Sequence, residues 1–299
     1  MMVANVLFAT MTICARLASA SVGWATIGGA RALGGAIVAA LFALQRGASL
    51  RTRRPKLSWA RSLFGTASML TTFYALSAKD LAVGDAVTLF ATAPLFIAVL
   101  SPLVLGEATG RSLWGVLLVA FGGVALVAGP HFSLGSFPAV CACMAAVFSA
   151  CAMMFLRLMR SGHGGGPPDG PEAIAFHFAV VAFVAHAAIA SFTFTMPVGR
   201  DALYVIGAGL SGGLAQLAMT RAYALDRAAR LSAMGYIGTV LGFTGAIVLL
   251  GERPGWLQIV GAALVVGAGV VLAFLTSHDV TPPAPVSVTA PAPKNPAST

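Results

Sequence analysis

Ten apolar runs, each about as long as a membrane-crossing helix, follow one another along this sequence of 299 residues. A helix rises about 1.5 Å per residue and needs about 20 residues to cross the hydrocarbon core of a bilayer, so these runs predict transmembrane helices. Lipid offers no hydrogen-bond partners to backbone groups, and the runs lack the alternation of a β-barrel strand. The predicted fold class is therefore an all-α membrane protein with ten transmembrane helices. The runs are 2–20, 24–45, 58–77, 81–104, 113–129, 135–156, 173–195, 202–224, 230–250 and 255–275.

The composition agrees with this class and argues against a soluble protein. Hydrophobic residues make up 58% of the chain and charged residues 9%, with a mean hydropathy of +0.90. Soluble domains carry about 25% charged residues. The formal net charge of +9 could suggest nucleic acid, but Lys and Arg gather in the short connections between apolar runs, where the orientation of membrane helices requires them. We expect the lipid bilayer, and not nucleic acid, as the partner.

The distribution of Lys and Arg among the connections predicts which side of the membrane each connection occupies. The even-numbered connections are rich in both residues, whereas the odd-numbered ones hold only Lys79, Arg200 and Arg253. Because positive charges are retained on the cytoplasmic side, both termini are predicted to be cytoplasmic, at the inner (plasma) membrane. The basic residues of the even-numbered connections are Arg46, Arg51, Arg53, Arg54, Lys56, Arg61, Arg111, Arg157, Arg160, Arg221, Arg227 and Arg230.

A pair of tripeptide motifs occurs twice in the chain. Tyr74–Leu76 (Tyr-Ala-Leu) leads through an apolar run to Leu105–Glu107 (Leu-Gly-Glu). Tyr223–Leu225 leads in the same way to Leu250–Glu252. A repeat within an apolar chain indicates a duplicated membrane bundle. Because five helices per half is an odd number, the second copy must enter the membrane inverted relative to the first.

This duplication divides the chain into two repeats and a tail. We predict a first five-helix repeat at 1–130 and a second, inverted repeat at 131–275. The tail at 276–299 contains six prolines among alanine, serine and threonine. Such a composition cannot bury a core, so the tail is predicted to be disordered and cytoplasmic.

Together these features resemble the EamA family of the drug/metabolite transporter superfamily. The resemblance rests on the ten runs, the duplication, the repeated tripeptides, and Ala93–Phe96 (Ala-Pro-Leu-Phe) in the fourth run, and it extends to the end of the tenth run. It implies a ten-helix inner-membrane carrier that moves small metabolites without ATP, commonly exporting amino acids or related compounds. Pro94, Glu107 and Glu252 are its motif residues. The first run begins almost at Met1, with hardly any residues before it, which differs from the family pattern. We therefore expect that the start of the sequence is truncated.

Several kinds of chemistry are excluded by missing patterns. No GxxxxGK[ST] loop occurs, so the chain has no phosphate-binding loop for ATP hydrolysis. The four cysteines lie inside apolar runs without CxxC spacing. His177 and His186 are nine residues apart, on opposite faces of one helix, and cannot share a metal ion. We predict no cofactor, no metal and no enzymatic activity.

Two arginines lie within predicted membrane helices. Arg16 shares one face of the first run with Asn5 and Thr12, and Arg31 lies some seven residues into the second run. An arginine at membrane depth costs about 2.5–3.5 kcal/mol on insertion scales, so it should face the bundle interior, water or a partner. The functional interpretation is an anion site for a substrate carboxylate or phosphate. The alternative is a structural arginine that ties a helix end to backbone carbonyls, which suits Arg16 better because it lies closer to the surface.

The fourth and ninth runs carry matching polar positions on one helical face, related by an offset of 147 residues. Matching polar faces in both halves are what a central substrate cavity requires. The alternative for the threonines is hydrogen bonding between packed helices. Asp85 could pair with Arg16 or Arg31, or carry a coupling proton. The positions are Asp85, Thr88 and Thr92 in the fourth run, and Ser232, Gly235, Tyr236 and Thr239 in the ninth.

Other polar side chains complete the candidate substrate site. Gln216 and Thr220 form an i, i+4 pair in the eighth run, after three glycines that allow close backbone approach, and a glutamine at membrane depth needs a partner such as substrate. Tyr74 could stack on a ligand, although a tyrosine near a helix end also serves as an interfacial anchor. Glu107 and Glu252 each stand just before a helix, so we expect their carboxylates to meet its free backbone amides.

These observations predict a secondary active transporter that exports a small metabolite, amino-acid-like or carboxylate-bearing, by alternating access. It would act as a monomer or a homodimer. One alternative is an uptake permease of the same family for a metabolite or cofactor precursor. An integral membrane enzyme would need an interfacial cluster of His, Asp or Glu, which the sequence lacks. A channel would line its pore with rings from an oligomer instead of using an inverted duplication.

Overall fold

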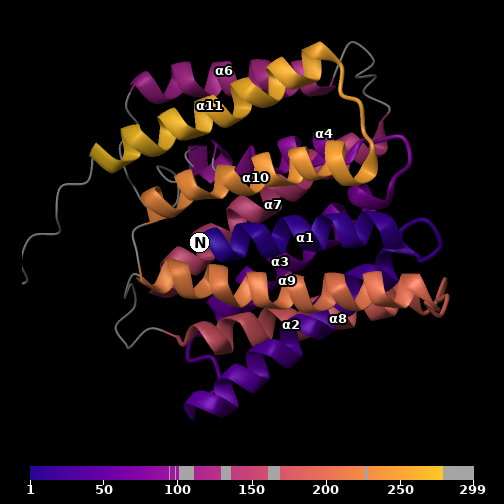
Figure 1. Cartoon of the computed structure of the whole chain (residues 1–299). Coiled ribbons are helices and arrows are strands. Elements are labelled where there is room, and N and C mark those ends of the chain that lie inside the picture. Colours follow the sequence, from indigo (N-terminus) through magenta and orange to yellow (C-terminus); the bar gives the residue numbers. More distant parts are fainter. Residues whose placement is uncertain are drawn as a thin grey trace, which may run out of the picture.

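The computed structural model describes residues 1–93, 95–97, 99–100, 111–128, 136–160, 169–225 and 228–278. Within these ranges every regular element is a helix, which confirms the all-α class (Figure 1). The helices are α1 (Met2–Ala18), α2 (Trp24–Arg46), α3 (Pro55–Ser77), α4 (Val83–Phe90), α6 (Arg111–Ala128), α7 (Phe137–Arg160), α8 (Pro171–Ala190), α9 (Arg200–Leu225), α10 (Ala228–Leu250) and α11 (Trp256–His278).

Most of these helices agree with the predicted apolar runs to within a few residues, and the fourth run is the exception. One helix was expected over 81–104, whereas α4 ends at Phe90, Ala91 and Thr92 form a turn, and residues 93, 95–97 and 99–100 are helical again. The Thr92 amide donates to the Leu89 carbonyl at 3.1 Å, and the Thr92 hydroxyl donates to the same carbonyl at 2.7 Å. These i, i+3 bonds tighten the last turn of α4 at the interruption.

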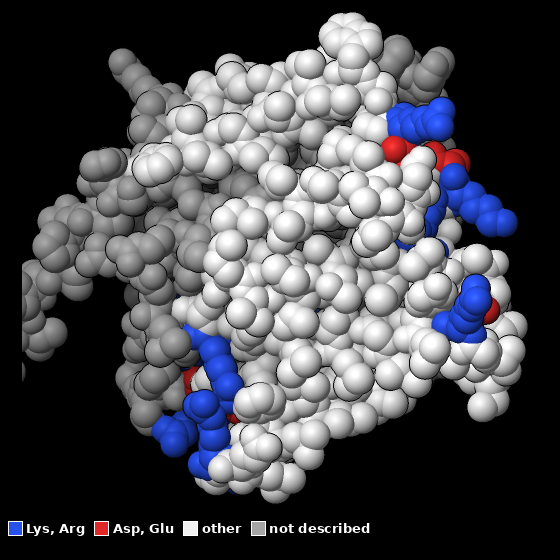
Figure 2. Space-filling model, viewed as in Figure 1, with Lys and Arg blue, Asp and Glu red and all other residues white. Residues whose placement is uncertain are grey.

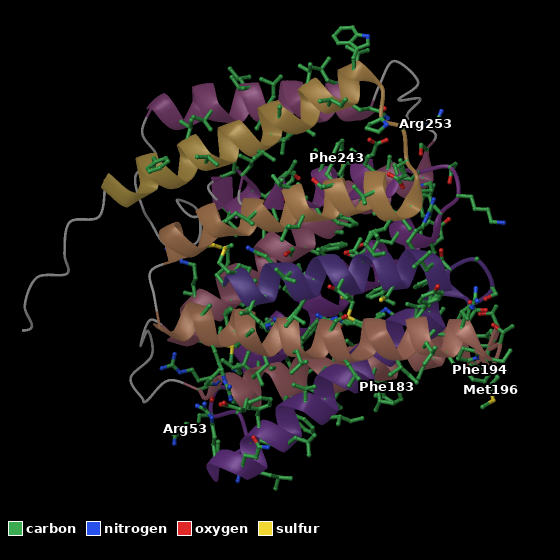
Figure 3. All side chains as sticks on the ribbon, viewed as in Figure 1. Arg53, Phe183, Phe194, Met196, Phe243 and Arg253 are labelled. Carbon is green, nitrogen blue, oxygen red and sulfur yellow. The ribbon has the colours of Figure 1, made fainter. Side chains whose placement is uncertain are left out.

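The surface of the bundle is that of a membrane protein. Four helices in the described part of the chain, α2, α7, α8 and α9, are long and apolar enough to cross a membrane, and shorter apolar stretches occur in α1, α10 and α11. Charged side chains gather toward the two ends of the bundle, with uncharged residues covering the face between them (Figure 2). Arg53 lies at one end, and Met196 and Arg253 lie at the other (Figure 3). The chain is therefore a multi-pass membrane protein.

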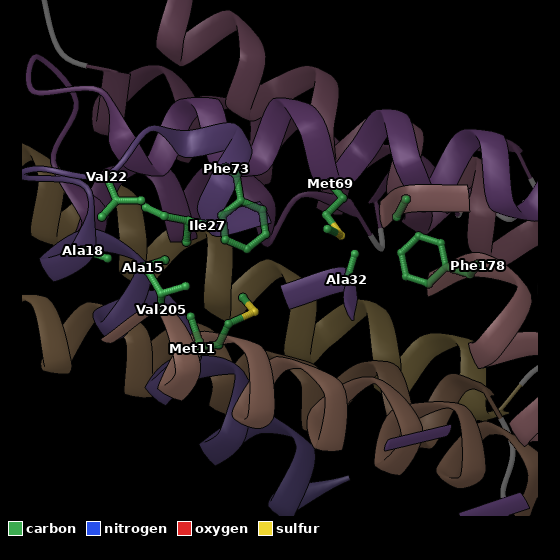
Figure 4. Packing of buried hydrophobic residues seen from close by; sticks show 12 residues of the cluster. Met11, Ala15, Ala18, Val22, Ile27, Ala32, Met69, Phe73, Phe178 and Val205 are labelled. Atoms are coloured by element: carbon green, nitrogen blue, oxygen red, sulfur yellow. The ribbon is translucent and has the colours of Figure 1, made fainter. Parts of the chain in front are cut away.

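The main packing joins helices that are far apart in the sequence. Helix α3 packs against α7, α2 packs against both α8 and α9, and α1 packs against α9 and α10. Helices α6 and α11 form a pair at one side of the bundle (Figure 1). The main hydrophobic cluster includes Met11, Ile27, Phe73, Phe178 and Val205, which come from α1, α2, α3, α8 and α9 (Figure 4). The core is thus formed between the two halves of the chain.

Three glycines bring the backbones of α2 and α9 into direct contact. A Cβ atom added at Gly34 would lie 2.4 Å from the carbonyl oxygen of Gly209, and one added at Gly213 would lie 2.8 Å from the carbonyl group of Gly34. Neither position can accept a side chain unless a backbone moves. This contact confirms that the glycines of the eighth run allow close backbone approach.

Candidate functional site

Arg31 projects from α2 into the centre of the bundle and is 5% exposed. Its Nη2 atom donates to Gln216 Oε1 at 2.9 Å, and its Nη1 atom lies 3.3 Å from Met69 Sδ. Gly212 on α9 makes room for this side chain, because a Cβ atom there would lie 2.7 Å from Arg31 Cγ. The structure therefore brings together two predicted site residues, Arg31 and Gln216, from helices in different halves of the chain.

The orientation of Gln216 is fixed by its own helix. The Thr220 hydroxyl donates to the Gln216 carbonyl at 2.8 Å, and Gln216 Nε2 lies 3.4 Å from Thr220 Oγ1. The predicted i, i+4 pair is thus formed, and it directs the amide oxygen of Gln216 toward Arg31.

Arg61 is a second buried arginine, and the sequence analysis assigned it to a cytoplasmic connection. It is instead 4% exposed, because it lies in the second turn of α3 on the side that packs against Phe178 of α8. Gly65 lies one turn further along the same face, where a Cβ atom would come within 2.5 Å of Arg61 Nη1. The sequence signal that could have indicated this buried position is the glycine four residues after the arginine, on the same helical face.

The two arginines share one aromatic ring. The Cζ atom of Arg31 lies 5.5 Å from the centroid of Phe178, and that of Arg61 lies 4.2 Å from it. We call Arg31, Arg61, Phe178, Gln216 and Met69 the cationic centre. An amide, a thioether and an aromatic ring all stabilise a guanidinium without neutralising it. Two positive charges therefore meet neutral partners at this point of the bundle.

Asp85 lies in the first turn of α4, away from the cationic centre. Its Oδ2 atom accepts a hydrogen bond from Gln258 Nε2 of α11 at 2.9 Å. Neither of the suggested pairings forms, because Arg31 is bound to Gln216 and Arg16 donates to the carbonyls of Leu76 and Ala78 at the end of α3. For Arg16, this contact is the structural alternative considered above.

The threonines of α4 satisfy their hydroxyl groups within their own segment. The Thr88 hydroxyl donates to the Gly84 carbonyl at 2.9 Å, and the Thr92 hydroxyl donates to that of Leu89. Both residues are buried. Their polar groups are therefore bound to backbone in this conformation, and not to a neighbouring helix.

The Glu252 carboxylate binds backbone amides at the start of a helix, as predicted. The helix is α4, however, and not the helix that follows Glu252 in the sequence. The carboxylate accepts hydrogen bonds from Val83 N at 2.7 Å and from Gly84 N at 2.9 Å, at the start of α4. Gly251 adopts a positive φ of 70° and turns the chain back over α4. The helix that follows Glu252, α11, is capped by Gln258 Oε1, which accepts from Gly255 N at 2.6 Å.

A cavity of about 130 Å³ lies beside this contact. Its lining includes Asp85, Phe243, Glu252, Arg253 and Gln258, and Figure 3 shows Phe243 and Arg253 on α10 and in the connection that follows it. Asp85 and Glu252 thus hold the end of α4 against α10 and α11.

Replacing Glu252 with alanine is expected to destabilise the protein by about 1–2 kcal/mol, because α4 loses the acceptor for two amides at its positive end. Hydrogen exchange at Val83 and Gly84 should accelerate. Asp80→Ala, in the neighbouring connection, should leave the exchange of both amides unchanged. Equal exchange rates in the Glu252→Ala variant and the wild type would show that the contact does not hold α4.

Tyr74 lies at the same end of the bundle as Trp24 and Phe137. The ring centroids of Tyr74 and Trp24 are 5.7 Å apart, and those of Tyr74 and Phe137 are 5.3 Å apart, both edge to face. These three rings, with Ser77 and Asp80, line a cavity of about 400 Å³. Tyr74 therefore faces a cavity at a helix end, which fits either a ligand contact or an interfacial anchor.

The remaining predicted residues are dispersed. Asn5 and Thr12 are buried on α1, with Asn5 against Gly238 of α10, and Thr239 is half-buried. Several predicted features lie outside the described residues or side chains, namely Pro94, Ser232, Tyr236, Glu107 and residues 279–299. Helix α11 continues to His278, past the predicted start of the tail.

His177 and His186, which were expected on opposite faces of one helix, have different neighbours on α8. His186 is fully buried between Trp24 and Phe73, in a notch that Gly28 leaves open. The Nδ1 atom of His177 lies 2.8 Å from Ser62 Oγ.

Comparison with known proteins agrees with this fold. Residues 1–129 match the EamA-like transporter family. The chain is 28% identical to the pseudopaline exporter CntI of Pseudomonas aeruginosa over 272 residues, which cover 90% of this chain and 93% of the exporter. It is 26% identical to a riboflavin transporter of Vibrio cholerae over 235 residues, which cover 77% of this chain and 74% of that protein.

A more distant relative and a solved structure extend the comparison. Solute carrier family 35 member G1 of Homo sapiens is 27% identical over 228 residues, which cover 70% of this chain and 60% of that protein. One solved crystal structure matches 92% of this chain and 98% of its own with a TM-score of 0.63 and 20% identity, so the two share a fold. Residues 1–129 of this chain therefore resemble the EamA-like transporter family, and the chain as a whole is similar to proteins named as transporters.

Proposed function

We propose that this protein is a secondary active transporter that exports a small carboxylate-bearing metabolite across the inner membrane by alternating access. The observation that carries this proposal is the cationic centre, where two buried guanidinium groups have neutral neighbours. A buried charge without a counter-charge carries a desolvation cost of several kcal/mol. A substrate carboxylate would supply the missing negative charge and offset that cost on binding.

Arg31 is the residue proposed to hold the substrate carboxylate. Its contacts with Gln216 and Met69 fix the guanidinium between α2, α3 and α9. Both partners are uncharged, so they orient the group without neutralising it. A guanidinium that is already oriented loses little side-chain entropy when it binds a carboxylate, and its planar donors match that group.

The inverted five-plus-five repeat remains part of the proposal, and the pattern of helix contacts supports it. Under this relation each helix of the first half has an equivalent helix in the second half. The equivalent pairs are α1 and α7, α2 and α8, α3 and α9, α4 and α10, and α6 and α11. When each helix is exchanged for its equivalent, the contact α3–α7 becomes α9–α1, α2–α9 becomes α8–α3, and α1–α10 becomes α7–α4, all of which occur. A pseudo-two-fold relation between the halves predicts this exchange.

The cationic centre follows the same relation at the level of single residues. Arg31 fills a notch at Gly212, and Phe178 fills a notch at Gly65, where a Cβ atom would lie 2.9 Å from the ring. The step from Arg31 to Phe178 and the step from Gly65 to Gly212 are both 147 residues. This offset also relates the polar positions of the fourth and ninth runs, and it supports placing the substrate near the axis between the halves.

We also propose that both termini are cytoplasmic and that the substrate moves outward. Helix α1 begins and α11 ends at the same end of the bundle (Figure 1), which supports an even number of membrane crossings. The proposed direction rests on the Pseudomonas aeruginosa relative that is named an exporter.

Counterflow in proteoliposomes tests the transport activity. Vesicles containing the purified protein would be loaded with an unlabelled acid and diluted into radiolabelled glutamate, glutamine, succinate or butyrate, with choline as a probe that lacks a carboxylate. We expect transient, saturable accumulation of at least one carboxylate and none of choline. Equal accumulation of choline and the carboxylates would contradict the proposal and favour a channel. A labelled product that differs chemically from the probe would contradict it and favour an enzyme.

A further inference from the structure

We propose that Arg61 is a second substrate-binding residue and that the transported substrate carries two carboxylates, one held at Arg31 and the other at Arg61. This inference rests on the proposed function and deepens it, because it specifies the charge and the chemical class of the substrate. It starts from a difference between the two arginines of the cationic centre.

The described residues provide hydrogen-bond acceptors for both terminal nitrogens of Arg31, but they provide none for two nitrogens of Arg61. Arg31 contacts Gln216 through Nη2 and Met69 through Nη1. The Nε and Nη1 atoms of Arg61 are buried and have no hydrogen-bond partner among the described residues, and the side chain is 4% exposed. Buried donors nearly always have partners, and charged donors are the most costly to leave unpaired. Arg61 is therefore prepared for a group that the described protein does not provide.

A second buried donor of α3, a hydroxyl, also lacks a hydrogen-bond partner among the described residues. Thr66 follows Gly65, the residue whose absent side chain makes room for the Arg61 guanidinium. The Thr66 hydroxyl is buried, and the described residues give it no hydrogen-bond partner. Because Thr66 is five residues after Arg61, it projects from a different side of α3, and the proposal rests on Arg61 alone.

Two buried acidic residues of the described chain, Glu172 and Asp169, bind groups outside the cationic centre, although Asp169 Oδ2 has no hydrogen-bond partner among the described residues. Glu172, in the first turn of α8, accepts a hydrogen bond from Arg221 Nη2 at 2.7 Å and from Arg221 Nε at 3.2 Å. Asp169 accepts a hydrogen bond from the Arg53 amide at 2.5 Å. His177, which lies one residue before Phe178, is bound to Ser62. Among the described residues neither of these carboxylates forms a hydrogen bond or an ion pair with the cationic centre, and we assign the counter-charge for Arg61 to the substrate.

Two anionic groups match the charge of the cationic centre better than one. A monocarboxylate would neutralise one guanidinium and leave the other buried with its charge unpaired. The Cζ atoms of Arg31 and Arg61 both lie close to the centroid of the Phe178 ring. The sum of their two distances from that centroid is therefore an upper limit for the distance between them. The second carboxylate of a short dicarboxylate or an acidic amino acid can cross such a separation. We therefore expect selection against analogues in which one carboxylate is missing or is an amide.

Counterflow with matched pairs of probes tests this inference. Glutamate and glutamine differ by one carboxylate, as do succinate and butyrate. Wild-type protein should accumulate the dicarboxylate of each pair at least about 10-fold faster, a margin typical of a lost charged contact. Arg61→Gln should lose this preference while monocarboxylate transport stays or rises. Arg61→Lys, which keeps the charge, should retain part of the preference, and Lys56→Gln, which removes an exposed charge from the same helix, should retain all of it.

The outcomes separate this inference from the proposed function. If Arg61→Gln lowers transport within each pair equally, or if wild-type protein prefers the monocarboxylates, Arg61 does not bind a second carboxylate, although carboxylate transport stands. If wild-type protein accumulates none of the four probes, the inference and the proposed function both fail. Size-exclusion profiles of each variant establish that the compared proteins are folded.

Discussion

Replacing Arg31 with glutamine is expected to lower carboxylate counterflow by about 30-fold or more, because removal of one partner from a buried charged contact typically costs about 2–5 kcal/mol. Glutamine retains hydrogen-bonding capacity but carries no charge. Gln216 would then face a neutral side chain, and the substrate would lose the oriented guanidinium. The initial rate of counterflow for the best wild-type probe is the quantity to compare.

Two further variants complete this test. Arg31→Lys keeps the charge but loses the planar donor array, so we expect intermediate rates. Lys79→Gln removes an exposed charge from the connection between α3 and α4 and should transport at the wild-type rate. If the Arg31→Gln protein is folded and transports as fast as Lys79→Gln, the substrate does not bind at the cationic centre.

Replacing Gly34 with alanine is expected to have the largest effect on stability. The added Cβ atom would lie 2.4 Å from the Gly209 carbonyl oxygen, which belongs to backbone and cannot rotate away. Such overpacking costs about 3 kcal/mol, which corresponds to a decrease in melting temperature of about 6–12 °C. Thermal unfolding in detergent, followed by intrinsic fluorescence, would measure the decrease.

Gly267→Ala is the matched control for this substitution. Gly267 lies in α11, where a Cβ atom would meet nothing within 4 Å. The better helix propensity of alanine should leave this variant as stable as the wild type or more stable by up to about 1 kcal/mol. Similar melting temperatures for the two variants would mean that the α2–α9 contact is looser than described.

The fold could be predicted where it depends on local hydrophobicity. Apolar runs bounded by charge or proline gave the helices and most of their ends, because insertion into lipid selects such runs one at a time. The interruption of the fourth run could not be predicted in this way, since hydropathy does not change at Phe90. It depends on the Thr92 hydroxyl and amide bonding to the Leu89 carbonyl, and threonine also occurs within continuous helices.

The candidate site depends on which helices meet, and a single sequence leaves this open. Arg31 and Gln216 could each be selected as polar residues at membrane depth, but their pairing required the α2–α9 contact. Arg61 was counted as an orientation charge because it lies near a basic connection, and the packing of α3 against α8 buries it. Glu252 was matched to the nearest helix in sequence, whereas a tight turn at Gly251 directs it to α4.

The interleaved packing of the bundle has a consequence for dissecting the molecule. Helices α1 and α2 bury their apolar faces against α8, α9 and α10, and α3 buries one of its faces against α7. A fragment that ends after residue 130 would keep its hydrophobic surfaces but lose the partners that cover them. Split between residues 160 and 171, the chain should recover its fold only when both fragments are made in the same cell, and neither fragment should accumulate by itself.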